Sequence, residues 1–355
     1  MTKRIASSIS FLLISTVAFS QEDSAKTSPW PTITGSVDVY YRYNFANAKD
    51  ASTGEKYTNN YTAFTNSRNS FELGMASLRA DHSFGKASAT VDLGFGKRAE
   101  EFSYANPDHS TLFAVKQAFL SYAVSDKFKL TMGKWATHIG YELTDAYLNR
   151  NYSMDYMFSY GPFSHTGLKA DIGLGKKSNL MLGVANTTDY VSQNNSRFFG
   201  LAQFSTATAD DKLSAYINYQ GSYGGSYGLT QFDLVLLGTV SDKFSIGYNG
   251  TVQSVKPDGG SSNSWWGSAL YFNVDPLSSF GITLRGEYFD NKKAVVAAPG
   301  TSIFDITLSP NFKIGNLTII PELRFENAKD EVFFKNNGDP VKSTFTGILA
   351  ATYHF

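Results

Sequence analysis

A period-two alternation of side-chain character is the feature of this sequence that most limits its possible folds. In the stretch "SVDVYYRYNF" at residues 36–45, apolar or aromatic residues occupy every second position, namely Val37, Val39, Tyr41, Tyr43 and Phe45. A β-strand places successive side chains on opposite faces, so this pattern indicates a strand whose two faces meet different surroundings. The alternation returns in "KLSAYINYQG", "FGITLRGEYF" and "TFTGILAATYHF", whereas helical spacing is almost absent.

Sixteen segments carry this pattern, and their connections alternate strictly between short and long. The predicted strands span 32–45, 70–83, 86–98, 111–123, 128–137, 163–174, 179–188, 196–207, 212–222, 229–239, 244–255, 263–274, 280–290, 301–313, 317–328 and 342–355. One short connection, VSDKF, occurs at both 124–128 and 240–244. Because an aspartate side chain can hydrogen-bond to the backbone two residues further on, we interpret this repeat as a recurring hairpin turn and not as a duplicated domain.

An even number of strands, with short turns at one end and longer loops at the other, is typical of an outer-membrane β-barrel. A closed barrel pairs every backbone group, as the bilayer interior requires. Two β-sandwiches in series are the alternative for an all-β chain of this length, but no linker interrupts the alternation. The predicted fold class is therefore all-β, a transmembrane antiparallel β-barrel of 16 strands over residues 32–355.

The N-terminus predicts export. Residues 1–20 combine a basic start, an apolar stretch and the small residues Ala18 and Ser20, which is the pattern of a cleaved signal peptide. We expect cleavage near Ser20–Gln21, which would leave residues 21–31 as a short periplasmic segment. Together with the barrel pattern, this predicts the cell outer membrane of a Gram-negative bacterium. Without two of its 31 basic residues, the chain keeps 31 − 2 = 29 against 31 acidic ones, a net charge of −2. This balance offers no basic surface for nucleic acid.

Charged residues within the predicted strands share one face, which we assign to the lumen. A basic side chain that faces lipid at mid-membrane costs roughly 2–4 kcal/mol. By this rule the pore wall holds Asp38, Arg42, Asp92, Lys169, Asp171, Asp233, Arg285, Glu287, Asp305, Glu322, Arg324 and Glu326. Arg79 and Asp81 are also expected on the lumen face, because the alternation of their strand shifts by one residue near Gly74. Lys134 would lie on the lumen face only if a bulge at Gly133 shifted the alternation there.

Two stretches carry a resemblance to a known family. The end of the chain, "GILAATYHF" with terminal Phe355, looks like the C-terminal assembly signal of Gram-negative outer-membrane proteins. "LTMGKWATHIGYE" and "NRNYSMDYMFSYGPFSHTG", within about 130–167, resemble the β-barrel porin-2 family of OmpL-like outer-membrane porins. The strand layout is similar over nearly the whole mature chain. The resemblance implies an outer-membrane diffusion channel and names no solute.

Loop 138–162 joins the fifth and sixth predicted strands, where sixteen-stranded general porins insert a loop that narrows the barrel. The residues expected to form a constriction are Tyr141, Glu142, Asp145, Tyr147, Arg150, Tyr152, Asp155 and Tyr156. We expect its carboxylates to face basic wall residues and its aromatic rings to contact solute. The alternative is a surface loop packed by its own aromatic residues. Because carboxylates outnumber basic groups on the loop and wall, a weak preference for cations is expected.

Strings that formally match catalytic motifs fail on their context. "GGSYG" at 224–228 lies in a predicted hairpin loop without a strand-to-helix elbow. "GFGKRA" at 94–99 resembles a dinucleotide motif, but a loop and no helix is expected after it. The five histidines lack metal-ligand spacing. We therefore predict no catalytic residues, no metal and no cofactor.

The function predicted is an outer-membrane porin, a passive channel for small hydrophilic solutes that loop 138–162 constricts. The alternatives are an outer-membrane enzyme, such as a hydrolase on a barrel scaffold, and an adhesion barrel that acts through its extracellular loops. The expected partners are outer-membrane lipid, the solutes themselves and the barrel-assembly machinery, which would bind Phe355. Oligomer formation is left open, and no nucleic acid is expected.

Overall fold

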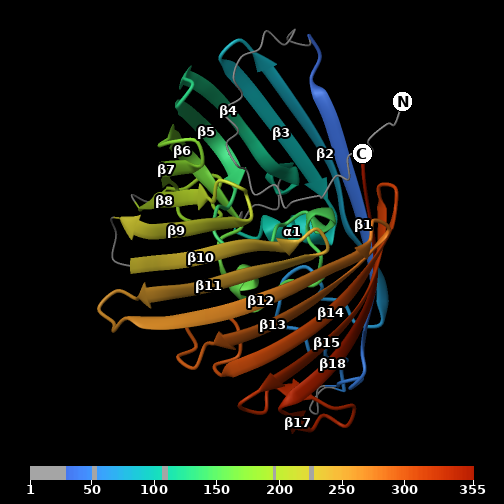
Figure 1. The fold of residues 1–355 in the computed structure, drawn as a ribbon. Coiled ribbons are helices and arrows are strands. Elements are labelled where there is room, and N and C mark those ends of the chain that lie inside the picture. Colours follow the sequence, from blue (N-terminus) through green and yellow to red (C-terminus); the bar gives the residue numbers. More distant parts are fainter. Residues whose placement is uncertain (1–28, 50–53, 106–110, 195–196, 224–227) are drawn as a thin grey trace, which may run out of the picture.

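Sixteen antiparallel strands close into a barrel in the computed structural model, which describes residues 29–49, 54–105, 111–194, 197–223 and 228–355 (Figure 1). The barrel strands are β1 Thr32–Asn44, β2 Ser70–Phe84, β3 Ala87–Phe95, β4 Val115–Ser125, β5 Phe128–Ala136, β6 Ser164–Gly173, β7 Ser178–Ala185, β8 Phe198–Ala207, β9 Leu213–Tyr223, β10 Gly228–Ser241, β11 Phe244–Lys256, β12 Asn263–Leu277, β13 Phe280–Asp290, β14 Ser302–Ile314, β15 Leu317–Ala328 and β18 Ser343–His354. Each strand pairs with its neighbours in sequence, and β18 pairs with β1 to close the ring. The predicted signal peptide and its cleavage point lie outside the described residues.

All sixteen predicted strands are found, with differences at their ends. The largest concerns residues 97–98 and 111–114, which were predicted as strand. Lys97–Phe102 forms a short helix, α1, and Thr111–Ala114 forms a 3-10 helix, η1. The expectation that no helix follows "GFGKRA" is therefore wrong, although α1 leads into an antiparallel neighbour and not into a parallel strand. A two-strand ribbon of β16 (Phe333–Phe334) and β17 (Pro340–Val341) lies in the loop before β18.

The two VSDKF sequences form equivalent hairpin turns. Ser125 pairs with Phe128 at the β4–β5 turn, and Ser241 pairs with Phe244 at the β10–β11 turn. In both turns the serine hydroxyl accepts a hydrogen bond from the lysine backbone N–H two residues later, at 3.4 and 3.3 Å. The repeat is a turn, as predicted, but serine makes the contact that was expected of aspartate.

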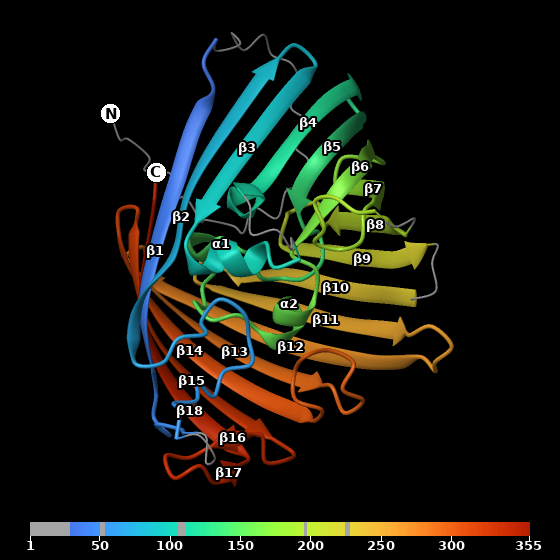
Figure 2. The same cartoon turned by 180° about the vertical axis from the view of Figure 1, so that it is seen from behind.

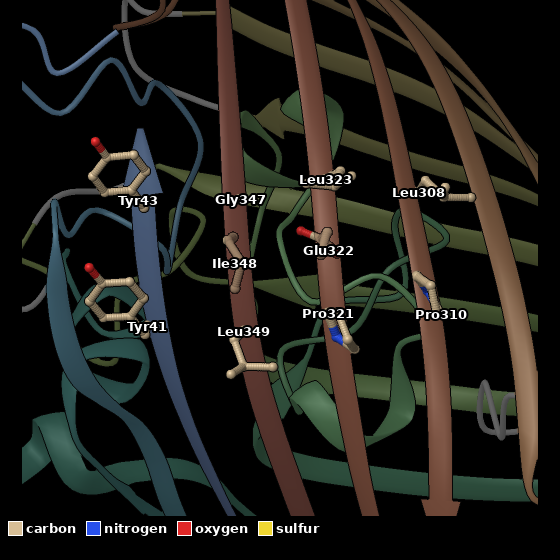
Figure 3. A pocket seen from close by; sticks show the side chains of 10 residues that line it. All are labelled: Tyr41, Tyr43, Leu308, Pro310, Pro321, Glu322, Leu323, Gly347, Ile348 and Leu349. Atoms are coloured by element: carbon tan, nitrogen blue, oxygen red, sulfur yellow. The ribbon is translucent and has the colours of Figure 1, made fainter. Parts of the chain in front are cut away.

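The alternation along each strand corresponds to the two faces of the barrel wall. On β14, for example, Asp305, Thr307 and Ser309 are buried inside, whereas Phe304, Ile306 and Leu308 are about two-fifths exposed on the outer face. A groove on this outer face is lined by Tyr41, Tyr43, Leu308, Pro310 and Leu323, among others (Figure 3). These outward side chains face lipid in a membrane, so the groove is not on a solute path.

A bulge at Gly74 positions Asp38 inside the barrel. The pairing of β1 with β2 shifts between Asp38 and Val39, whose partners are Met75 and Leu73, so Gly74 is left unpaired. A Cβ atom on Gly74 would lie 1.7 Å from Asp38 Oδ2. The predicted phase shift near Gly74 is thus confirmed, and only glycine leaves room there for the carboxylate.

Candidate pore constriction

Loop 138–162 lies inside the barrel and contains two short helices, η2 (Ala146–Leu148) and α2 (Tyr156–Tyr160) (Figure 2). The side chains of Tyr152, Asp155 and Tyr156 are completely buried. Asp155 caps α2, because its Oδ1 accepts a 2.6 Å hydrogen bond from Phe158 N. The alternative of a surface loop is therefore wrong.

Two wall arginines bind the loop. Arg285 on β13 donates to Glu142 Oε1 at 2.6 Å and to the carbonyl of Ser153 at 2.8 Å. Arg324 on β15 donates to the carbonyl of Met154 at 2.7 Å. A guanidinium has five N–H donors in a fixed plane, so each arginine can also contact the wall carboxylate Asp305, at 3.6 and 2.5 Å.

Wall carboxylates bind the opposite partners, namely loop N–H and O–H groups. Glu287 accepts from the backbone N–H of Tyr156 at 2.9 Å and of Met157 at 3.1 Å. Glu322 accepts from Tyr152 N at 2.7 Å. The phenol of Tyr152 donates to Asp38 at 2.6 Å, and that of Tyr156 donates to Glu326 at 2.6 Å. Together these contacts fasten the middle of the loop to β13, β15 and β1.

The other predicted loop residues also contact the wall. Tyr141 stacks on Tyr271 of β12, with ring centroids 3.9 Å apart, and Tyr147 stacks on His354 of β18 at 4.9 Å. Asp145 pairs with Lys116 of β4 at 2.6 Å, and Arg150 binds Asp275 through two hydrogen bonds of 2.8 and 3.0 Å. The expected pairing of loop carboxylates with basic wall residues is therefore present for Glu142 and Asp145.

The predicted wall residues all point inward, but most of them do not face water. Apart from Lys169, every one is at most 4% exposed, because the loop and neighbouring wall groups cover it. Alternation identifies the inner face of a strand and cannot reveal what lies against that face. The expected preference for cations assumed that these carboxylates are open to the lumen. The structure shows that they are covered, so this assumption is wrong.

Two further segments enter the barrel and were missed in the sequence. Residues 54–69 bring in Phe64, and α1 brings in Arg98 and Phe102; all three side chains are at most 1% exposed. The phenylalanines pack with Met154, Phe158 and Phe163 in one cluster. The guanidinium of Arg98 lies 3.7 Å from Asp38. Residues 54–69 carry no periodic pattern, and the first two residues of α1 were predicted as strand, so neither insertion was expected.

Lys134 is turned inward without the predicted bulge. The β4–β5 and β5–β6 registers are continuous at Gly133, but this residue has a φ of +134°. Lys134 Nζ donates to the carbonyl of Val115 at 2.8 Å and lies 5.1 Å from the centre of the Phe102 ring. The positive φ of Gly133, which glycine adopts readily, thus turns Lys134 to the inner face, where a bulge was expected to do so.

Burial has a large effect on Glu142, which lies on the loop outside the strands. Desolvation, and next the nearby Asp155 carboxylate, raise the pKa of Glu142 to about 7, although Arg285 opposes the shift. Burial raises the pKa of Asp155 as well. The two residues are also in direct contact, because the backbone N–H of Asp155 donates a hydrogen bond to Glu142 Oε2 at 2.8 Å.

The described residues contain no cluster of three or more His, Cys, Asp or Glu side chains that could hold a metal ion. Ser226, the serine of the "GGSYG" string, lies outside them. No helix in the described part of the chain is long and apolar enough to cross a membrane.

The closed sixteen-stranded barrel, apolar outside and charged inside, defines the protein as an outer-membrane channel of the porin class. The chain belongs to the family described as "Putative beta-barrel porin-2, OmpL-like", which matches residues 31–355.

Solved porin structures share the fold at low sequence identity. The anion-selective porin from Comamonas acidovorans is 13% identical, with a TM-score of 0.60 over 92% of this chain and 99% of that one. OprB of Pseudomonas putida is 9% identical, with a TM-score of 0.60 over 92% and 94%. The outer membrane channel DcaP of Acinetobacter baumannii is 12% identical, with a TM-score of 0.58 over 92% and 97%. No curated protein matches the sequence.

Proposed function

We propose that the protein lets small hydrophilic solutes diffuse passively across the outer membrane, and that loop 138–162 sets the width of its pore. The observation that carries this proposal is the contact of Glu142 with Arg285, at 2.6 Å, on the far side of the interior from the strands that the loop joins. A loop fastened so far from its ends reduces the open cross-section. Nothing in the contacts of the described residues favours the enzyme or the adhesion barrel.

We further propose that both chain ends face the periplasm and that the assembly machinery recognises Phe355. The final residue is paired with the start of β1, because the N–H groups and carbonyls of Gly35 and Phe355 form two hydrogen bonds of 3.0 Å. Its ring is 56% exposed on the outer face, beside Tyr353. This position leaves the terminal aromatic ring accessible on the outer face.

Recording from the purified protein in planar bilayers tests the proposed function. A diffusion channel gives discrete conductance steps without any added energy source. An enzyme or an adhesion barrel with a sealed interior gives none, so a folded protein without steps would refute the proposal.

The raised pKa of Glu142 predicts a pH-dependent pore width. If the loop is released, Glu142 returns to its ordinary pKa of 4.5. The docked loop therefore binds the proton more tightly, and its docking is favoured below pH 4.5 and weakened as the pH rises through about 7. We expect conductance to fall when the pH is lowered from 8 to 5.

Two variants check this pH dependence. Glu142→Gln should hold the low conductance at pH 8 and reduce the pH response, leaving the part due to Asp155. Glu100→Gln, at an exposed carboxylate, should respond like the wild type. A conductance that rises on acidification would contradict the assignment to Glu142.

A further inference from the structure

Water-exposed charges inside the barrel are unevenly distributed. The loop covers the inner faces of β9 to β15, β18 and β1, where nearly all mid-strand inward residues are buried. On β2 to β8, in contrast, several inward side chains keep contact with water, including those of Arg79 at 38%, Lys129 at 31% and Lys169 at 19% exposure. A solute that passes the loop would therefore travel beside β2 to β8.

Three ion-pair groups inside the barrel contain water-exposed basic side chains. Arg79 pairs with Asp81; Lys129 and Lys169 share Asp171; and Arg150 and Lys313 share Asp275. Two of these groups hold two basic residues against one carboxylate.

Lys129 and Lys169 are the least satisfied of these basic residues. Their ammonium groups lie 3.7 and 3.9 Å from the Asp171 oxygens, beyond hydrogen-bonding distance, whereas ammonium or guanidinium nitrogens in the other two groups approach to 2.6–3.2 Å. Asp171 is 4% exposed, and its Oδ2 has no hydrogen-bond partner. An ammonium group has three donors, so both lysines can still bind an anion.

The wall beside these lysines is formed by glycines and one aromatic ring. On the extracellular side of Lys169, Gly133 and Gly167 face each other across β5 and β6, and Gly183 of β7 pairs with Lys169. Beyond the glycines, the buried ring nitrogens Trp135 Nε1 and His165 Nδ1 have no hydrogen-bond partner. The Lys169 ammonium lies 5.5 Å from the centre of the Trp135 ring, so an aromatic face adjoins the two lysines.

We infer that Lys129 and Lys169 form an anion-binding site on the diffusion path, which makes the channel prefer solutes with a carboxylate or phosphate group. The inference rests on the proposed function, since an anion must pass through the barrel to meet these lysines. The two positive charges on adjacent strands attract the anion, and Asp171 between them keeps its binding weak enough for release.

Reversal potentials in a potassium chloride gradient across planar bilayers test the inference. The wild type should show a chloride-to-potassium permeability ratio above one. The double variant K129Q/K169Q should lower this ratio about two- to fivefold, the size expected for a unit charge at contact distance in water. D171N should raise the ratio, and inorganic phosphate should reduce chloride current in the wild type more than in K129Q/K169Q.

The control is K177Q/K212Q, which removes two lysines at exposed turns outside the lumen and should leave the ratio unchanged. A conducting wild type that prefers potassium, or a ratio that neither K129Q/K169Q nor D171N changes, overturns the inference and leaves the proposed function intact. If the double variant does not fold, D171N alone decides. No conductance from the folded wild type overturns both.

Discussion

Deletion of residues 142–158 is expected to raise single-channel conductance several-fold. A barrel of 16 strands is wide enough for an aqueous channel unless something fills it, and these residues include the whole stretch from Glu142 to α2 that lies against the wall. The remaining residues can still join β5 to β6, because paired strands lie only about 5 Å apart. The deletion should also shift ion preference toward cations, since Glu287, Glu322 and Glu326 then face water.

A deletion in an exposed loop provides the control. Residues 257–261 join β11 to β12 and are exposed, so their removal should leave conductance unchanged. The folded state of both variants can be checked by the heat-dependent shift of the barrel on gels. Unchanged conductance in a folded 142–158 deletion would mean that the loop does not limit the pore.

Arg285→Met is expected to be the most destabilising single substitution at the constriction. The guanidinium is completely buried and lies 2.6 Å from Glu142 and 3.6 Å from Asp305. Removing one partner from a buried ion pair leaves an uncompensated charge and costs about 3–5 kcal/mol. Here two carboxylates and the Ser153 carbonyl lose a donor together. We expect a lower unfolding temperature and a loosened loop, and therefore larger and noisier conductance.

Arg79→Met is the matched comparison. Arg79 also pairs with a carboxylate, at 2.6 Å, but both side chains are about two-fifths exposed. Such pairs contribute about 0–1 kcal/mol, so thermal unfolding measured by circular dichroism should hardly change. Equal losses of stability in the two variants would contradict the role of Arg285 as the main anchor of the loop.

The strands and the direction of their charged residues could be predicted from the sequence because membrane and lumen impose opposite requirements on alternate positions. On β13, Arg285 and Glu287 could be assigned to the inside from their shared spacing and the cost of a charge that faces lipid. The location of loop 138–162 inside the barrel was predicted from a resemblance to general porins. Its constriction residues were predicted from their charge and aromatic character. Its contacts with Glu322 and Asp38 could not be predicted, because they join residues 114 to 170 positions apart.

What remained unpredictable has local physical causes. Phe64 lies on an irregular segment, where no periodicity reports burial, and Arg98 lies on α1, whose first two residues were predicted as strand. The inward direction of the Lys134 side chain depends on the φ angle of Gly133, which the neighbouring residues do not predict. Which carboxylates meet the lumen depends on what the loop covers, so a count of charged residues cannot give the ion preference. Exposure, and not composition, separates Lys129 and Lys169 from the buried wall arginines.

The most direct test of the central claim, that this barrel is a diffusion channel narrowed from within, is single-channel recording of the wild type beside the 142–158 deletion. We predict discrete steps from the wild type, with current proportional to voltage, and larger steps from the deletion. A folded wild-type barrel that never conducts, or steps of equal size from the two proteins, would contradict the claim.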